Sequence, residues 1–168
     1  SKARAVAAMR PRDFLPIPAL RLGLSDPVSG LNMGETAEVL AREFGIGRDA
    51  QDAFALRSHK RAAEAEARLA EEITPAYDTG RGAAVLQDNG VRPNQSREAL
   101  AKLRPVFEKG TGTVTAGNSS QITDGAAVLL IGTEAAANSL GLEPLGAIRG
   151  FAYTGCDPKR MGLGPVYA

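Results

Sequence analysis

The sequence predicts an α/β fold, and three observations predict it. Apolar residues recur at helical spacing between positions 35 and 72. A continuous apolar run of strand length, Ala126–Ile131, follows later, as expected for a strand covered on both faces. The 19 glycines and 10 prolines require many turns between such elements. Because the helical part precedes the part with the longest apolar run, we expect two structural units with a break near Gly110–Gly117.

The predicted helices are recognised by apolar spacing and by residues that favour helix ends. In the first, Ala37, Leu40, Ala41 and Phe44 lie at i, i+3, i+4 and i+7, and Gly45 is a natural stop. The second is rich in alanine, which favours helix and close packing. The predicted helices are Glu35–Phe44, Arg48–Glu72, a short helix from the capping residue Ser96 to Leu103, and Thr133–Leu140 closed by Gly141, with the tail of a further helix over residues 1–9.

The remaining segments are predicted to be strands or irregular chain. Four prolines make residues 10–31 extended and irregular. Asn89-Gly90 is a turn signal. The predicted strands are Ile73–Ala76, Ala83–Leu86, Thr113–Thr115, Ala126–Ile131 and Leu145–Tyr153.

Composition limits the class of protein. With 168 residues, 43% of them apolar, the chain can form one domain of ordinary size with a core. The net charge of +1 gives no global indication of nucleic acid or of a membrane surface as partner. No apolar run approaches the roughly 20 residues of a membrane span. The single cysteine, Cys156, excludes an internal disulfide and favours a reducing compartment, which we expect to be the cytoplasm.

The chain begins with Ser1, and its end carries no helix stop, so we expect both ends to be cuts through a longer chain.

The densest polar stretch is Thr113–Gly125, directly before the apolar run. Its short hydrogen-bonding side chains and its glycines can hold the amide or hydroxyl groups of a ligand. An ordinary polar turn explains the same composition. A locally basic segment that runs from Arg92 to Lys109 has two interpretations as well, a solvated surface or a site for a phosphorylated ligand.

The residues most often used in catalysis are scarce. His59 is the only histidine, and the sequence shows neither an orienting partner nor a nucleophile beside it, which favours a structural or solvent role. Nothing around Cys156 predicts an activated thiol. One cysteine and one histidine far apart form no ligand cluster, so no metal is expected.

Several segments, taken in order, resemble the thiolase family over nearly the whole chain. The resemblance rests on Met33–Glu38, Asp49–Ser58, Gly112–Ser120 followed by Thr123–Ala127, and Gly155–Pro165. The Asn118-Ser-Ser form and Gly30–Gly34 look closest to the thiolase subunits of fatty-acid β-oxidation complexes.

The resemblance implies a thiolase-like α/β fold with a helical loop domain and incomplete parts of both α/β halves. Residues 1–115 are then mainly the loop domain with the coenzyme A groove. Residues 116–143 are the end of the N-terminal half, and residues 144–168 begin the C-terminal half.

The resemblance also implies an activity for the parent protein, an acyl-CoA C-acyltransferase. The family cleaves 3-oxoacyl-CoA with coenzyme A or runs the reverse Claisen condensation. Its nucleophilic cysteine, its activating histidine and its second cysteine have no counterpart among these residues. Cys156 and His59 do not match them. No catalytic residue is therefore assigned, and the isolated chain is predicted to be inactive.

Of the family's properties, the resemblance implies coenzyme A binding for the residues of this chain. Coenzyme A is then a substrate, and no permanently bound cofactor is expected. Arg92 matches an arginine near the adenine, Ser120 a serine that contacts the pantetheine amide, and Met161 a pocket wall. The other groove positions are Leu24, Met33, Phe107 and Ala116. This chain has Asn32 where a histidine is frequent and Ala99 where some members have serine, which removes polar contacts.

The implied partners are acyl-CoA and coenzyme A, a second copy in a homodimer or homotetramer, and a hydratase/dehydrogenase subunit. No nucleic acid and no membrane span are expected. The alternative is a non-catalytic module that binds a nucleotide-like ligand or mediates oligomerisation through its alanine-rich helix. A redox or metal protein is a remote third interpretation. Cysteine and histidine motifs in the flanking coding sequence would favour the acyltransferase.

Overall fold

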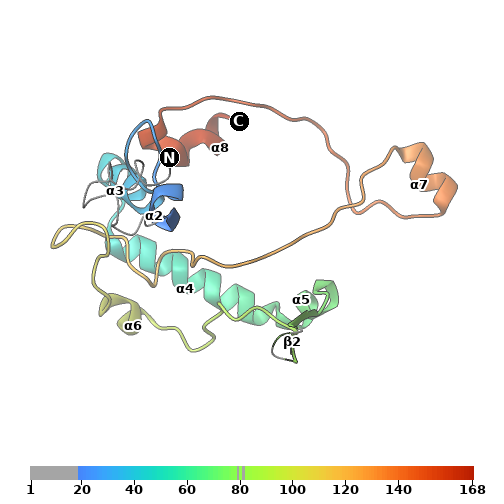
Figure 1. Ribbon diagram of the computed structural model, residues 1–168, viewed down its shortest axis with the longest axis horizontal. Coiled ribbons are helices and arrows are strands. Elements are labelled where there is room, and N and C mark those ends of the chain that lie inside the picture. Colours follow the sequence, from blue (N-terminus) through green and yellow to red (C-terminus); the bar gives the residue numbers. More distant parts are fainter. Residues whose placement is uncertain (1–18, 79, 81) are drawn as a thin grey trace, which may run out of the picture.

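The structure is a computed structural model that describes residues 19–168 except positions 79 and 81. The helix tail expected over residues 1–9 lies outside the described residues, as do residues 10–18 of the segment 10–31 that was expected to be irregular. Within the described part of that segment the expectation is wrong at Ala19–Gly23, which is a short helix. The elements in chain order are α2 (Ala19–Gly23), α3 (Met33–Glu43), α4 (Arg48–Glu64), α5 (Glu66–Glu72), β1 (Ala76–Asp78), β2 (Ala83–Val85), α6 (Arg97–Ala101), α7 (Glu134–Leu140), the 3-10 helix η2 (Pro158–Leu163) and α8 (Gly164–Tyr167) (Figure 1).

Helix α3 confirms the first predicted helix, although it begins at Met33. Asn32 starts it because its side chain accepts a hydrogen bond from the Glu35 backbone N–H, while the Glu35 carboxylate accepts one from the Asn32 N–H. Such a reciprocal cap satisfies backbone donors that the first helical turn leaves free. Gly45, at a positive φ of 63°, turns the chain away after the helix.

The predicted helix Arg48–Glu72 is interrupted at one residue. Ala65, with φ −91° and ψ 4°, ends α4 and precedes α5. The Leu69 N–H still donates to the Ala65 carbonyl at 2.9 Å, so α5 follows α4 directly, with a local bend between them. Helix α4 then presents a half-buried face to the rest of the fold, with Asp52 as its only buried residue.

The two short helices form where their capping residues predict them. Ser96 accepts from the Ala99 N–H at the start of α6, and Thr133 accepts from the Ala136 N–H at the start of α7. The Ser96 hydroxyl also helps to lower the pKa of Glu98, after the larger effect of the Glu98 backbone N–H. Gly141 closes α7 in the left-handed conformation, with φ 66°.

The strand predictions are only partly confirmed. β1 and β2 form an antiparallel hairpin in which Tyr77 pairs with Ala84. β1 overlaps the predicted Ile73–Ala76 at one residue, and β2 lies within the predicted Ala83–Leu86. Thr113–Thr115 is extended and largely buried but is not a strand, and Ala126–Ile131 and Leu145–Tyr153 are also not strands in the described residues. A strand needs a neighbour for a continuous ladder of backbone hydrogen bonds. Thr113–Thr115 has one such bond, from the Val106 N–H to the Val114 carbonyl at 3.0 Å, and no ladder forms in the described chain.

The core is small and unusually polar. Its buried apolar residues are Ala41, Leu100 and Val114. Thr36, Glu38, Asp52 and Thr115 are buried with them, between α3, α4, α6 and the segment after Gly112. Buried polar groups are tolerated only when they are hydrogen-bonded, so this core depends on a polar network.

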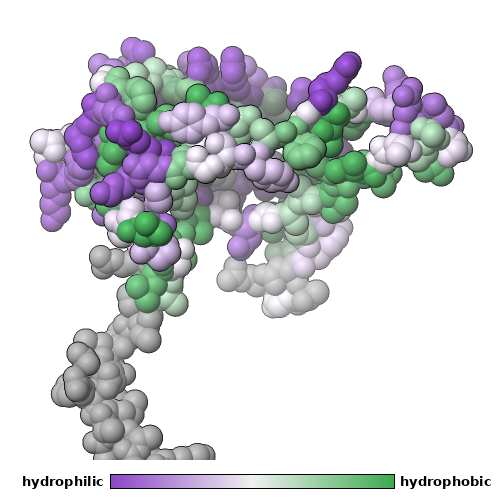
Figure 2. All heavy atoms as spheres, turned by 90° about the horizontal axis from the view of Figure 1, so that it is seen from above, coloured by the Kyte–Doolittle hydropathy of each residue, from purple (hydrophilic) through white to green (hydrophobic). Residues whose placement is uncertain are grey.

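The two chain segments that flank α7, residues 121–132 and 142–155, are exposed. They extend away from α4 and return to the C-terminal helices in Figure 1. Val128 is 95% exposed, Leu130 86% and Tyr153 93%. Figure 2 shows hydrophobic atoms gathered along these segments. Apolar surface of this extent is typical of a region that another polypeptide surface covers.

Among the described residues, no helix has both the length and the apolar character needed to cross a membrane.

We predict that the isolated 168-residue chain associates as its concentration rises, because the exposed apolar segments can pair with one another between molecules. Analytical ultracentrifugation over a hundredfold range of concentration measures this. Leu130→Lys should reduce the association, since a charge blocks strand pairing, whereas Leu86→Lys, at a leucine outside these segments, should not. A monomeric chain with a sharp, concentration-independent two-state melt would contradict the prediction.

Candidate functional site

The centre of the candidate site is the segment Thr113–Ser120, which we name the TAGN segment. Its first residues are held by the Glu38 carboxylate, which projects from α3 and is 1% exposed. The Thr113 N–H donates to both carboxylate oxygens at 2.8 and 3.0 Å, and the Thr113 hydroxyl donates at 2.9 Å. The Val114 N–H donates at 2.8 Å. Hydrogen bonds to a charged acceptor are stronger than neutral ones, so one side chain fixes two consecutive peptide groups.

The same segment is held from α4. Asp52 accepts from the Arg48 side chain at 2.7 Å and from the Asn118 amide nitrogen at 3.0 Å. Arg48 in turn donates to the Leu100 and Leu103 carbonyls, which ties α4 to the end of α6. Asp52 therefore has partners on both of its oxygens, which compensates the cost of burying a carboxylate.

Asn118 closes the TAGN segment into a turn. Its amide oxygen accepts from the Thr115 N–H at 2.7 Å, while its amide nitrogen donates to the Thr113 carbonyl at 3.0 Å. Reversing the amide would set donor against donor and acceptor against acceptor, so the orientation is unambiguous. Thr115 is fully buried, and Ala116 lies exposed at the tip of the turn.

Two glycines allow this close packing. A Cβ on Gly112 would lie 2.5 Å from the Glu108 carbonyl oxygen and 2.8 Å from a Glu38 carboxylate oxygen. A Cβ on Gly117 would lie 2.5 Å from methyl groups of Leu100 and Leu103. Neither glycine has a positive φ, so space and not backbone conformation requires glycine here.

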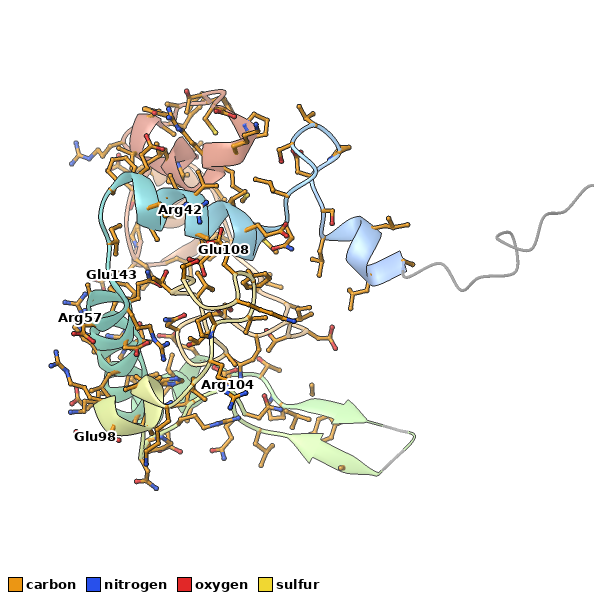
Figure 3. The ribbon with its side chains drawn as sticks, turned by 90° about the vertical axis from the view of Figure 1, so that its left-hand side faces the viewer. Arg42, Arg57, Glu98, Arg104, Glu108 and Glu143 are labelled. Atoms are coloured by element: carbon orange, nitrogen blue, oxygen red, sulfur yellow. The ribbon has the colours of Figure 1, made fainter. Side chains whose placement is uncertain are left out.

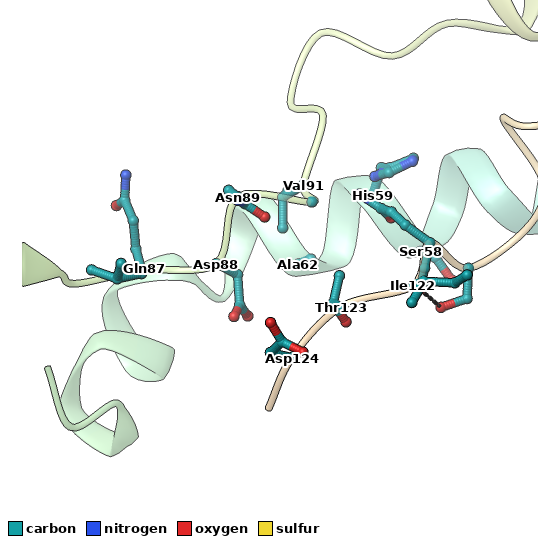
Figure 4. Close-up of a pocket in the computed structure, with 14 residues that line it drawn as sticks. Ser58, His59, Ala62, Gln87, Asp88, Asn89, Val91, Ile122, Thr123 and Asp124 are labelled. Carbon is teal, nitrogen blue, oxygen red and sulfur yellow. Dashed lines mark hydrogen bonds between the residues drawn. The ribbon is translucent and has the colours of Figure 1, made fainter. Parts of the chain in front are cut away.

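An open pocket of about 880 Å³ lies beside the end of the TAGN segment (Figure 4). Its walls come from α4, from residues 85–91 and from residues 120–124. Ser58, Gln121 and Thr123 contribute neutral polar groups, and the carboxylates of Asp88 and Asp124 point toward one another (Figure 4). The lining offers hydrogen-bond partners and negative charge, so a neutral polar group fits it better than a phosphate.

Arg92 lies next to this pocket without lining it. Its backbone N–H donates to His59 Nδ1 at 3.2 Å, which joins the loop to α4. Its guanidinium donates to the Asn89 and Val91 carbonyls at 2.8 and 3.1 Å. Within the described part of the chain Arg92 has no carboxylate partner, so its positive charge is not neutralised there. His59 acts here as a structural acceptor, in line with the role that the sequence favours.

A second cluster surrounds the start of α3. Ser25 and Asn32 form an antiparallel bridge that brings Leu24 and Met33 near one another. In this turn the Ser29 hydroxyl, and then its N–H, lower the pKa of Asp26. The Phe107 ring lies against Gly34, where no side chain would fit.

Two ion pairs attach neighbouring segments to this cluster. Arg42 of α3 pairs with Glu108, next to Phe107 (Figure 3). Arg160 pairs with Glu43 at 2.9 Å, and η2 packs on α3 with Gly162 against Leu40. Because η2 packs on α3, Met161 lies beside the helix that begins with Met33. Met161 is 46% exposed.

The predicted coenzyme A residues thus fall into two groups. Leu24, Met33, Phe107 and Met161 are arranged around α3, whereas Ser120 lines the pocket and Arg92 follows the lining residue Val91. Ala116 lies at the exposed tip of the TAGN segment. Only Ser120 of the predicted residues lines the pocket itself. Their common role in one groove remains a prediction.

Glu38 and Asp52 were not predicted from the sequence, and Asn118 was predicted only as one polar residue of a loop. A buried carboxylate cannot be told from a surface one by spacing alone. Two signals were available: all three residues lie in segments that resemble the thiolase family, and Glu38 lies beside Ala37 and Ala41, at the edge of the apolar face of the predicted helix.

Within the described residues, no group of three or more histidine, cysteine, aspartate or glutamate side chains could hold a metal ion. Cys156 is a half-buried free thiol.

Comparison with known proteins identifies the class. The sequence pattern of the family "Thiolase, N-terminal domain" matches residues 13–135. In three dimensions the chain is similar to a crystal structure of human mitochondrial 3-ketoacyl-CoA thiolase, with a TM-score of 0.81 and 39% identity over 89% of this chain and 38% of that one. It is also similar to the Bacillus anthracis acetyl-CoA acetyltransferase, with a TM-score of 0.80 and 38% identity over 94% of this chain and 42% of that one. The chain therefore belongs to the thiolase family, and its structure is a partial thiolase fold.

Two similar curated relatives are bacterial proteins. It is 44% identical to a 3-ketoacyl-CoA thiolase of Escherichia coli O1:K1 over 163 residues, which are 95% of this chain and 37% of the relative. It is 42% identical to the 3-ketoacyl-CoA thiolase of Citrobacter koseri over 99% of this chain and 38% of the relative. The chain thus spans less than two fifths of the length of these relatives.

We predict that Gly112→Ala lowers the free energy of unfolding by about 1–3 kcal/mol, the usual cost of forcing extra volume into a packed site. The new methyl group meets a backbone carbonyl, which cannot move as a flexible side chain can. Gly125→Ala is the matched control, because nothing lies within 4 Å of the place its Cβ would take and the effect should stay within about 0.5 kcal/mol. Chemical denaturation of the two variants measures the difference, and equal stabilities would show that the close contact is unimportant.

Proposed function

We propose that this chain supplies coenzyme A-binding elements to a thiolase, an acyl-CoA C-acyltransferase that cleaves 3-oxoacyl-CoA with coenzyme A or catalyses the reverse condensation. The observation that carries the proposal is the position of Ser120. It lies where a TAGN segment fixed by Glu38 and Asn118 meets a pocket with neutral hydrogen-bonding groups. A similar structure, human mitochondrial 3-ketoacyl-CoA thiolase with a TM-score of 0.80, is a complex with CoA.

The chemistry of coenzyme A agrees with the arrangement of the proposed residues. The pantetheine arm carries neutral amides, which suit the Ser120 hydroxyl and the uncharged polar groups of the pocket. The phosphates need positive charge, and Arg92 offers a guanidinium whose described partners are neutral carbonyls. Met33 and Phe107 are 55% and 37% exposed, so their apolar surface is available to the ligand. Apolar walls with a few polar contacts are typical of small-molecule sites.

The chemical step is proposed to use residues other than those of this chain. Thiolysis needs an activated sulfur nucleophile and a general base within hydrogen-bonding reach of it. Cys156 has no such base among its described contacts, and His59 uses Nδ1 to accept from Arg92. Because the chain spans 37% of its E. coli relative, the remaining length can supply these groups. We propose that the whole protein works in the cytoplasm in fatty-acid β-oxidation, as a homodimer or homotetramer and with a hydratase/dehydrogenase subunit as partner.

A second candidate function is a non-catalytic oligomerisation module. The exposed apolar segments around α7 favour it, since they offer a surface for another polypeptide. Coenzyme A binding distinguishes the two functions, because a pure oligomerisation module does not bind the ligand.

We predict that Ser120→Ala weakens binding of coenzyme A about tenfold, which corresponds to the loss of about 1.4 kcal/mol from one hydrogen bond. Isothermal titration calorimetry with coenzyme A measures the dissociation constant. Ser139→Ala is the control, because this serine bonds only within α7, to the Ala136 carbonyl. Equal binding by the two variants would remove Ser120 from the site. Absence of binding by the unchanged protein would refute the proposed function.

We predict that the pure 168-residue chain does not catalyse thiolysis of acetoacetyl-CoA, whereas the protein expressed from its full natural coding sequence does. The loss of the enolate absorbance of acetoacetyl-CoA follows the reaction. Turnover by the 168-residue material would show that its own residues perform the chemistry. Assay of the full protein over a series of acyl lengths gives its substrate range.

A further inference from the structure

We propose that Glu38 and Asn118 are positioning residues for coenzyme A, in that they set the place of Ala116 and Ser120 and thereby the affinity for the ligand. The inference rests on the proposed function and adds to it two side chains that do not themselves contact the ligand. They hold the TAGN segment from opposite ends, one from α3 and one through Asp52 of α4.

Glu38 determines where the TAGN segment begins. All of its hydrogen bonds go to Thr113 and Val114, and the described residues place no cation beside it. A buried carboxylate is costly unless donors surround it, so the backbone of these two residues must stay where the oxygens are. The Gln51 amide donates to the Thr113 hydroxyl at 2.8 Å and directs the hydroxyl proton toward Glu38. The start of the segment is thus fixed in position and in hydrogen-bond direction.

Asn118 determines where the segment ends. Its contacts to Thr113 and Thr115 set the curvature of the turn, and its contact to Asp52 attaches the turn to α4. The Ser119 hydroxyl adds a bond to the Thr115 carbonyl at 2.7 Å. Ser120 follows directly, so the position of its hydroxyl depends on this attachment.

After Ser120 the described contacts are a local hydrogen bond, from the Ser120 hydroxyl to the Gln121 carbonyl at 3.3 Å, and the Gln121 side chain against Gly90. Residues 121–132 are exposed and belong to no helix or strand. The long-range hydrogen bonds that set the place of Ser120 therefore come from the preceding side, through Asn118 and Glu38. Ala116 depends on the same contacts, because it is the exposed tip of a turn whose neighbours Val114 and Thr115 are buried. A shift of the segment moves both proposed ligand contacts together, and a hydrogen bond lengthened by about 1 Å beyond its usual length is lost.

The test uses the protein expressed from its full natural coding sequence and compares Glu38→Gln with Glu35→Gln. Gln at position 38 replaces one acceptor oxygen by an NH₂ group that faces the donors of the TAGN segment. Gln at position 35 keeps an acceptor for the Asn32 N–H on the same helix. We expect Glu38→Gln to raise the dissociation constant of coenzyme A and its KM in thiolysis about tenfold, with kcat within about twofold. Glu35→Gln should leave both constants unchanged.

Two further measurements separate positioning from stability. A variant that only destabilises the fold lowers the amount of active protein, and with it the apparent kcat, but leaves KM unchanged. Asn118→Ala should also raise KM, and the double variant should be less than additive with Glu38→Gln, because both act on one segment. If Glu38→Gln does not fold, Thr113→Val removes one donor to Glu38, and Thr113→Ser, which keeps the hydroxyl, is its control.

The outcomes are distinct. Unchanged KM and dissociation constant in folded Glu38→Gln, or in Thr113→Val, overturn the positioning role while the proposed function stands. Strictly additive effects of Glu38→Gln and Asn118→Ala on KM would contradict the claim that both variants act by displacing the TAGN segment. If the unchanged protein fails to bind coenzyme A, the proposed function itself is wrong.

Discussion

The hydrogen bonding of the buried Glu38 carboxylate to the backbone of Thr113 and Val114 is the interaction on which the described fold depends. It joins α3 to a segment that lies 75 positions later in the chain and carries the most polar part of the sequence. With so few buried apolar residues, hydrophobic burial alone gives little to hold these parts in register. A charged acceptor with several backbone donors supplies direction as well as energy, which apolar contacts do not.

The two parts of the described chain differ in the interactions that hold each of them in place. The part around α3, α4, α6 and the TAGN segment is held by hydrogen bonds, caps and ion pairs. The segments on either side of α7 make almost none, and their apolar side chains face outward. The chain spans 37% of the E. coli relative and 38% of the human structure that it resembles.

Local signals in the sequence predicted the helices from α3 to α7, but not the short helices α2, η2 and α8. Asn32, Ser96 and Thr133 each start a helix through a hydrogen bond to a nearby N–H, and Gly141 ends one, because capping depends on residues within one turn. The strands were less predictable. An apolar run such as Ala126–Ile131 has the composition of a buried strand, but a strand exists only through its neighbours, which no local pattern provides. The bend at Ala65 has no counterpart in the sequence either, since alanine is the best helix former.

By itself the sequence determined most of the helical segments and the family. Those properties depend on short-range spacing and on motifs. Only the tertiary structure decided that Glu38 and Asp52 are buried, that Asn118 closes the TAGN segment and that Ser120 faces a pocket formed with α4. The physical reason is that burial and hydrogen-bond partnership between residues far apart in the chain arise when the backbone brings them together, and spacing along the sequence carries no record of that distance.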